Sequence, residues 1–412
     1  MDRVVLHSDL NNFYASVECI QHPEWRNIPM AVAGDPEARH GIVLAKNEVA
    51  KRYGIRTAEA LWQARQKCPN ILFVPPHFDR YMAYSRAARE MYSQYTDQVE
   101  SFGADECWLD VTGSGLLFGS GEKIAHELRE RMKKELGLTV SVGVSFNKVF
   151  AKLGSDMKKP DAVTILSREN FKEKVWPLPV GELLFAGPAT CEKLRRRGIT
   201  NIGQLAHAPV RFLEYTLGKL GPQLHKYANG EDDSPVLRPD QLPPVKSIGN
   251  STTAAHDLTS PEDIRITLYV LCESVSARMR EAGFNARTVQ LTIKDNTLQK
   301  QECQCRLEPA NHTAKALFDA AYKLYQTHKP TRPVRLLGVT ATGFEDEEEA
   351  QLSFLPEAKT LERVEKLETA VDTLREKYGD KTLQRGLMFL DRSLSDVTPK
   401  KEHPMQRADN TR

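Results

Sequence analysis

The chain has 412 residues, of which 40% are apolar and 27% are charged, and its formal net charge is +2. This balance excludes a disordered, highly charged chain and a strongly basic chain that coats nucleic acid indiscriminately. The length predicts roughly two to four domains. No apolar run of about 18 residues occurs, so we expect no membrane span.

Seven cysteines are scattered along the chain without a C-x-x-C pair, so the sequence indicates neither a zinc site nor a dithiol redox motif. The N-terminus carries the charged residues Asp2 and Arg3 and no apolar signal-peptide region. This cysteine usage fits a reducing compartment, and we expect a cytoplasmic protein.

The first part of the chain mixes strand and helix patterns. The expected elements are, in chain order, strand 3–9, helix 11–21, helix 79–97, hairpin 99–111, helix 122–136 and strand 139–144. Gly137 is a typical C-cap for the last of these helices. The order predicts an α+β domain with helices on one face of a mainly antiparallel sheet.

The second part begins with an all-helical region at residues 168–230. Residues 231–245 are rich in proline and aspartate and indicate an extended linker. A second α+β unit follows at about 246–344, and the acidic run Glu345–Glu349 ends it. Its expected elements are helix 261–281, strand 289–294, helix 313–327 and strand 334–342. Apolar residues at spacings of three and four predict one more helix at 359–378.

Three carboxylates give the strongest chemical signal. Asp9 and the pair Asp105-Glu106 sit at the ends of strand-like segments with apolar neighbours. Two-metal phosphoryl transfer needs several carboxylates that converge on cations roughly 3.5–4 Å apart, and hard oxygen ligands suit Mg²⁺. Adjacent residues on a straight strand face opposite ways, so both members of the pair reach one site only where the strand turns or ends. The alternative is a solvated turn, although buried charge needs compensation.

An aromatic pair, Phe13-Tyr14, follows Asp9 within five residues. One ring there can lie under a bound sugar and exclude a 2′-hydroxyl, and the alternative is a pair of core aromatics. Two basic clusters can neutralise a triphosphate, with a solvated helix surface as the alternative. They are Lys46, Lys51 and Arg52, and Lys148, Lys152, Lys158 and Lys159.

Taken together, residues 7–18, 105–112, 141–148 and 152–160 resemble the Y family of DNA polymerases, the translesion enzymes, and most closely their bacterial DNA polymerase IV branch. The resemblance extends over about residues 2–345 and implies an α+β right-hand polymerase. The implied parts are a palm at 1–10 and 78–165, fingers at 11–77, a thumb at 166–235, a linker at 236–245, a little finger at 246–344 and a tail at 345–412.

The resemblance also implies roles for single residues. Asp9, Asp105 and Glu106 hold two Mg²⁺ ions and carry catalysis. Tyr14 is the steric gate against ribonucleotides, and Phe13, Lys51 and Lys159 contact the incoming nucleotide.

Some positions depart from the family pattern. Glu48 and Lys51 stand where a tyrosine and an arginine are common, so we expect Glu48 to turn away from phosphate and Lys46 to compensate. In the thumb, Phe185 stands where the phosphate-binding helix-hairpin-helix often has its first glycine, and Pro188 follows Gly187.

Charge is distributed unevenly. Residues 246–344 carry 13 Lys and Arg against 9 Asp and Glu, whereas residues 345–412 carry 12 against 16. A basic little finger can follow the duplex backbone without reading bases. The candidate DNA contacts are Lys148, Lys152, Lys246, Arg287 and Arg332.

Gln351, Leu352, Phe354 and Leu355 lie in a segment similar to the peptide that binds the bacterial sliding clamp, and we call residues 351–355 the clamp peptide. The helix at 359–378 can cap the domain, pack locally or pair with a partner.

The sequence therefore predicts a monomeric, template-directed DNA polymerase of low fidelity that acts in translesion synthesis and DNA repair. Its partners are primer-template DNA, deoxynucleoside triphosphates and the sliding clamp. No separate exonuclease domain is expected, so neither is proofreading. One alternative is a non-catalytic, clamp-bound DNA repair scaffold, and another is a palm-type nucleotide cyclase.

Overall fold

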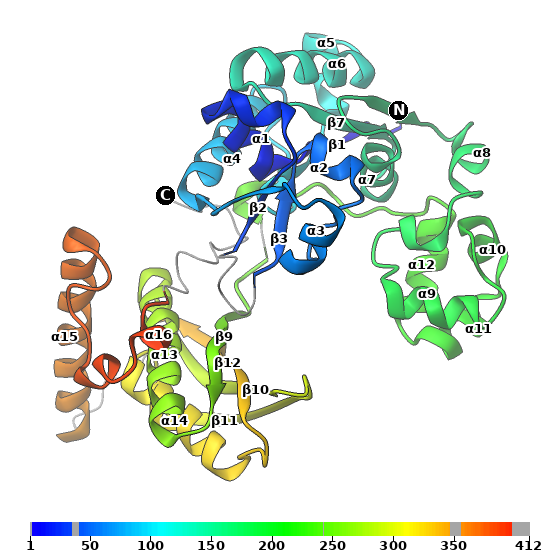
Figure 1. Ribbon diagram of the computed structural model, residues 1–412. Coiled ribbons are helices and arrows are strands. Elements are labelled where there is room, and N and C mark those ends of the chain that lie inside the picture. Colours follow the sequence, from blue (N-terminus) through cyan, green and yellow to red (C-terminus); the bar gives the residue numbers. More distant parts are fainter. Residues whose placement is uncertain (1, 35–40, 242, 347–355, 398–412) are drawn as a thin grey trace. The chain divides into compact units, whose positions relative to one another are not determined.

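The computed structural model describes residues 2–34, 41–241, 243–346 and 356–397 of the chain, and the clamp peptide lies outside them. The chain divides into two compact units (Figure 1). Among the described residues, the first unit holds 2–34 and 42–241, and the second holds 41, 243–346 and 356–397. No helix in these ranges is long and apolar enough to cross a bilayer.

The first unit is built on a five-stranded sheet. Its strands, in spatial order, are β5 (Val99–Ser101), β6 (Glu106–Asp110), β1 (Val5–Leu10), β7 (Val140–Ser145) and β8 (Val163–Leu166). Neighbours pair antiparallel except β7 and β8, which are parallel. The predicted hairpin and the two predicted strands are confirmed, and the sheet is mainly antiparallel as expected.

The prediction that helices cover one face of this sheet is wrong, because both faces are covered. The helices that pack on it include α1 (Phe13–Gln21), α4 (Phe78–Ser93), α6 (Gly121–Arg131) and α7 (Lys148–Met157). Side chains of α1, α4 and α6 share a hydrophobic cluster with Val142. The next residue, Gly143, points to the other face, where a Cβ would lie only 1.9 Å from the carbonyl oxygen of Ala151 in α7. The absence of a side chain at Gly143 thus lets α7 lie directly on the sheet.

Two smaller parts complete the first unit. A three-stranded sheet orders β3 (Val43–Lys46), β2 (Met30–Ala33) and β4 (Leu72–Val74), with α2 (Glu48–Arg52) and α3 (Leu61–Lys67) beside it in sequence. A short helix, α5 (Gly115–Phe118), precedes α6. The predicted all-helical region is confirmed as α8 (Phe171–Val175), α9 (Pro188–Arg195), α10 (Ile202–His207), α11 (Val210–Leu217) and α12 (Leu220–Ala228).

The second unit contains an antiparallel sheet with the order β11 (Lys300–Asn311), β10 (Phe284–Asp295), β12 (Val334–Asp346) and β9 (Ser247–Leu258). The helices α13 (Pro261–Ala282) and α14 (Ala314–Thr327) share a core with one face of this sheet, to which Val289, Leu291 and Ile293 contribute. Residues that alternate with these three point to the opposite face. That face is polar, with Thr288, Gln290 and Thr292 on β10.

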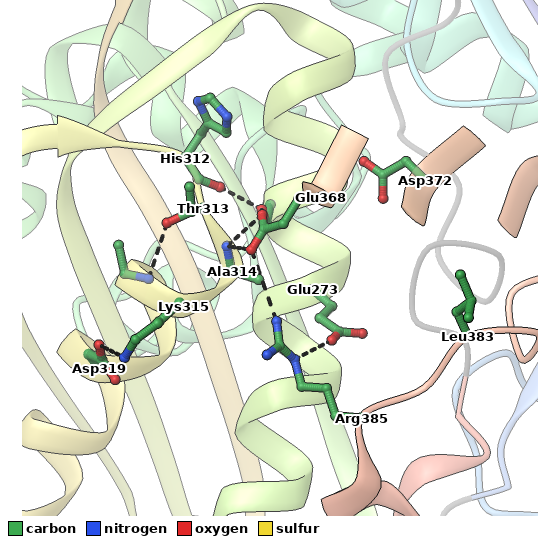
Figure 2. Close-up of polar contacts among 12 residues, drawn as sticks. Glu273, His312, Thr313, Ala314, Lys315, Asp319, Glu368, Asp372, Leu383 and Arg385 are labelled. Carbon is green, nitrogen blue, oxygen red and sulfur yellow. Dashed lines mark hydrogen bonds and ion pairs between the residues drawn. The ribbon is translucent and has the colours of Figure 1, made fainter. Parts of the chain in front are cut away.

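Two helices follow β12, namely α15 (Pro356–Tyr378) and α16 (Arg392–Ser395). Figure 2 shows the polar contacts that join this segment to the rest of the second unit. Both carboxylate oxygens of Glu368 on α15 accept from the backbone N–H of Ala314 at the start of α14, at 3.1 Å. Arg385 donates to Glu273 on α13 at 2.6 Å. Of the roles that the sequence left open for the last long helix, packing against its own unit is the one observed.

Candidate active site

The three predicted carboxylates meet at one end of the five-stranded sheet. Asp9 on β1 is in register with Glu106 on β6. Asp105 immediately precedes β6, and its backbone carbonyl accepts a hydrogen bond from the backbone N–H of Leu10 at 3.0 Å. The preceding turn contains Gly103 with φ of +89°, a conformation that glycine adopts readily. Because the strand begins only after this turn, Asp105 and Glu106 can reach the same site.

Two lysines lie among these carboxylates. The Nζ atom of Lys152 on α7 is 2.8 Å from Glu106 Oε2 and 3.5 Å from Asp9 Oδ2. The Nζ atom of Lys159 is 2.7 Å from Asp9 Oδ2. Asp156 pairs with both lysines, at 3.2 and 2.8 Å. Lys152 was predicted to contact DNA, but in this position a phosphate contact would have to break its ion pairs.

Burial and mutual repulsion separate the pKa values of the three carboxyl groups. Burial, followed by the charges of Asp9 and Glu106, raises the pKa of Asp105 to about 7. Burial would also raise the pKa of Glu106, but His7 and Lys152 outweigh it and lower that pKa to about 2. The pKa of Asp9 is raised by burial although Lys159 opposes the rise. The cluster therefore concentrates more negative charge than its lysines neutralise.

This chemistry fits a hard divalent cation. Carboxylate oxygens are preferred ligands of Mg²⁺, and a bound cation would offset the burial and the repulsion that together raise the pKa of Asp105. Among the described residues, no three His, Cys, Asp or Glu side chains are already arranged as a metal cage. Lys152 instead lies between Asp9 and Glu106 and supplies the positive charge there. The three carboxylates thus have the composition of a metal site, and the assignment of Mg²⁺ to them stays a prediction.

Sequence patterns did not reveal that the buried side chain of His7 lies next to Glu106. His7 on β1 is fully buried, and its Nε2 atom lies 3.2 Å from Glu106 Oε2. Its Nδ1 atom is 2.8 Å from Ser155 Oγ on α7. Burial lowers the pKa of His7, which favours the neutral ring. A usable signal was present, because His7 and Asp9 are two residues apart on one strand and therefore point to the same face.

The aromatic pair is divided between the core and the site. Phe13 is 3% exposed, which leaves little of its ring for the predicted nucleotide contact. Tyr14 is half-buried, and its ring stacks on that of Tyr81 with centroids 4.3 Å apart. Burial, followed by the charge of Asp105, raises the pKa of Tyr14. Tyr14 lies in the first turn of α1, four residues after the end of the strand that carries Asp9, and its role as the sugar gate stays a prediction.

The residues that depart from the family pattern near the start of α2 make contacts with neighbouring side chains. Glu48 accepts a hydrogen bond from Asn12 Nδ2 at 2.7 Å and lies 3.6 Å from Lys51 Nζ. Asn12 directly precedes α1, the helix that carries Tyr14. Lys46 donates to Thr57 Oγ1 at 3.0 Å. Glu48 therefore connects α2 to the start of α1, while Lys51 keeps 47% of its side chain exposed.

The other predicted DNA contacts differ in exposure. The side chain of Lys148 is only 12% exposed, and its Nζ is 2.7 Å from both carboxylate oxygens of Glu100. In the second unit, Lys246 is exposed, whereas Arg287 and Arg332 are 45% and 54% exposed and each has a polar partner. Lys246, Arg287 and Arg332 are accessible to a ligand in solution, whereas Lys148 would first have to leave its ion pair with Glu100.

Comparisons with known proteins cover most of the chain. Residues 8–156 match the model described as impB/mucB/samB family, and residues 245–354 match the C-terminal domain of that family. The chain is 50% identical over 399 residues to DNA polymerase IV of Acetivibrio thermocellus, with 96% of this chain and 100% of that protein covered. It is 37% identical over 397 residues to DNA polymerase IV of Clostridium kluyveri, with 94% and 99% covered.

The fold also has a solved counterpart. The structure titled Y-family DNA polymerase chimera Dbh-Dpo4(243-245)-Dbh matches with a TM-score of 0.74 at 22% sequence identity. The match covers 82% of this chain and 98% of that one. This likeness establishes the arrangement of helices and sheets.

Proposed function

The chain belongs to the impB/mucB/samB family, that of the Y-family DNA polymerases, and we propose that it extends a DNA primer on a template by two-metal phosphoryl transfer, with low fidelity and past damaged bases. It is a DNA-directed DNA polymerase whose relatives over nearly the full length are DNA polymerases IV. One observation carries the mechanism: Asp9 and Glu106 are in register on neighbouring strands, with Asp105 at the turn beside them.

In this mechanism Asp9, Asp105 and Glu106 would hold two Mg²⁺ ions, which when bound activate the primer 3′-hydroxyl and stabilise charge on the triphosphate. The chain's own residues set up this chemistry. His7, whose Nε2 atom lies 3.2 Å from Glu106 Oε2, would help to hold the Glu106 carboxylate in place. With these three carboxylates neutralised, Lys152 and Lys159 would keep only Asp156 among the acidic partners described above, and their ammonium groups would be available to the anionic triphosphate.

The sugar and the template require further surfaces. Tyr14 would exclude the 2′-hydroxyl of a ribonucleotide, and Lys51 would meet phosphate. The polar face of the sheet in the second unit would follow the duplex, because small hydroxyl and amide side chains can approach a backbone without reading base sequence. The exposed cations Lys246, Arg287 and Arg332 would add phosphate contacts.

The remaining assignments extend the same proposal. We assign the five-stranded sheet to the palm, the three-stranded sheet to the fingers, the region of α8–α12 to the thumb and the second unit to the little finger. The clamp peptide would tether a monomeric, cytoplasmic enzyme to the sliding clamp.

Primer extension separates this proposal from a non-catalytic scaffold. A labelled primer annealed to an undamaged or a lesion-containing template is incubated with deoxynucleotides, with Mg²⁺ or with EDTA. We expect extension on both templates with Mg²⁺ and none with EDTA. Tight DNA binding without extension in any condition would favour the scaffold and overturn the catalytic proposal.

A further inference from the structure

A buried carboxylate for which the proposed mechanism has no task lies one helical turn after Tyr14. Glu18 on α1 is 0% exposed. It is surrounded by donors from the segment that starts α4: Tyr81 OH donates to Oε1 at 2.6 Å, His77 Nδ1 lies 2.9 Å from Oε1, and Arg80 Nη1 donates to Oε2 at 3.1 Å. A buried charge is costly unless it is paired and hydrogen-bonded, so this arrangement is a built one.

Tyr81 connects Glu18 to the sugar gate. Its ring is completely buried and stacks on the ring of Tyr14, with an interplanar angle of 13° and centroids 4.3 Å apart. Phe78 meets the Tyr14 ring edge-on at 5.9 Å. Tyr14 and Glu18 are four residues apart, so they project from the same side of α1. The contacts therefore link Tyr14 to Tyr81 and Tyr81 to Glu18, and Glu18 lies on the same helix as Tyr14.

We propose that Glu18 is a positioning residue for sugar selection, because it holds the Tyr81 hydroxyl and thereby fixes the ring against which Tyr14 rests. The inference rests on the proposed role of Tyr14 as the gate. A gate that rejects a single additional oxygen must hold its position to within about 0.5 Å. If the ring behind it could slide, Tyr14 would retreat and admit the 2′-hydroxyl.

Two substitutions that change the shape of the side chains little test whether Glu18 and Tyr81 position Tyr14. Tyr81→Phe removes only the hydroxyl, and Glu18→Gln removes the charge. The measurement is kcat/KM for a deoxynucleotide and for the matching ribonucleotide on one primer-template. We expect each variant to lower the deoxy-to-ribo ratio about tenfold, as for loss of a hydrogen bond to a charged group. The change should come from faster ribonucleotide use, with deoxynucleotide efficiency within about twofold of wild type.

A matched control exists in the same core. Tyr95 donates its hydroxyl to Glu127 Oε1 at 2.6 Å, the distance found between Tyr81 and Glu18. Among the described aromatic contacts, its ring pairs with Phe118 and not with Tyr14. Tyr95→Phe should therefore leave the deoxy-to-ribo ratio unchanged, although it removes a tyrosine–glutamate hydrogen bond of the same length, which here goes to an exposed carboxylate.

A double variant shows whether Tyr81 acts through Tyr14. Tyr14→Ala should open the gate, and Tyr81→Phe should then add no further loss of selectivity. Additive losses would overturn the inference, and so would equal falls in both efficiencies for Tyr81→Phe, since these indicate a merely structural role. An unchanged ratio in Tyr14→Ala would overturn the gate and the inference together. Primer extension by the wild type would still uphold the polymerase proposal in that case.

Discussion

Replacement of Asp105 by Asn should stabilise the metal-free protein and abolish primer extension. The carboxylate is buried close to Asp9 and Glu106, and these neighbours contribute to raising its pKa to about 7 from an ordinary value of 3.8. Asparagine keeps the shape of the side chain and removes the charge. The same substitution removes an oxygen ligand that the proposed metal site needs.

The size of the stabilisation follows from the pKa of Asp105. The rise amounts to about 3 pH units, and each unit corresponds to about 1.4 kcal/mol, which sets an upper limit of about 4 kcal/mol. Because neighbouring carboxyl groups share the repulsion, we expect about 1–3 kcal/mol. Because the pKa of Asp105 is raised in the folded state, protonated Asp105 contributes stability to the wild type below about pH 4. The wild type loses that stability between about pH 4 and pH 7, as the buried carboxyl group ionises. The variant should therefore gain on the wild type as the pH rises from 5 to 8.

Urea unfolding at pH 5 and pH 8 in EDTA, together with primer extension in Mg²⁺, measures both effects. Mg²⁺ should also stabilise the wild type more than the variant, since a ligand that binds the folded state stabilises it. Asp97→Asn is a suitable control, because Asp97 is 70% exposed and pairs with Arg238 at 3.0 Å. A variant that is less stable than wild type at pH 8, or that extends primers normally, would refute the reasoning.

Three further predictions concern the clamp, the tail and the sheet. Alanine at Gln351, Leu352 and Phe354 should weaken binding to the sliding clamp in surface plasmon resonance and leave distributive synthesis intact; equal binding would exclude the site. Glu368→Ala removes the acceptor of the Ala314 backbone N–H and one of the two carboxylate partners of Arg280, which keeps Asp372, so the free energy of unfolding should fall by about 1–3 kcal/mol in urea, whereas no change would mean that α15 is not docked. Gly143→Ala places a methyl group against the backbone of α7 and should cost about 3 kcal/mol, a loss that thermal unfolding would reveal.

The sequence was sufficient to predict that Asp105 and Glu106 lie together at a strand end, because the determinants of that arrangement are local, whereas Asp9 joins them through the pairing of β1 with β6. Strand ends and the turn at Gly103 are visible as patterns of apolar, polar and glycine residues, and they bring Asp105 and Glu106 to the end of one strand. The covering of the sheet was not predictable in this way. It depends on the contact of Gly143 with a helix that lies outside its own strand, and no periodicity records such a contact.

Glu18 and Phe185 illustrate a second limit of sequence patterns. A glutamate inside a helix usually indicates an exposed face, and only the donors supplied by α4 show why Glu18 is buried. Phe185 adopts φ of +67°, a region in which glycine is favoured, and 55% of it remains exposed. The backbone at Phe185 thus adopts a conformation that glycine favours, at the position where the family pattern often has a glycine.

The lysines near the carboxylates show why a count of basic residues overstates the surface available to DNA. Lys148 and Lys152 were counted as DNA contacts, yet each is held by acidic groups of its own unit. A cation bound at Glu106 would compete with Lys152 for that carboxylate. If Mg²⁺ is that cation, then binding of the metal and release of the lysine toward the triphosphate are coupled. The ion pairs that compensate the buried carboxylates in the metal-free protein are then also the source of positive charge for the substrate.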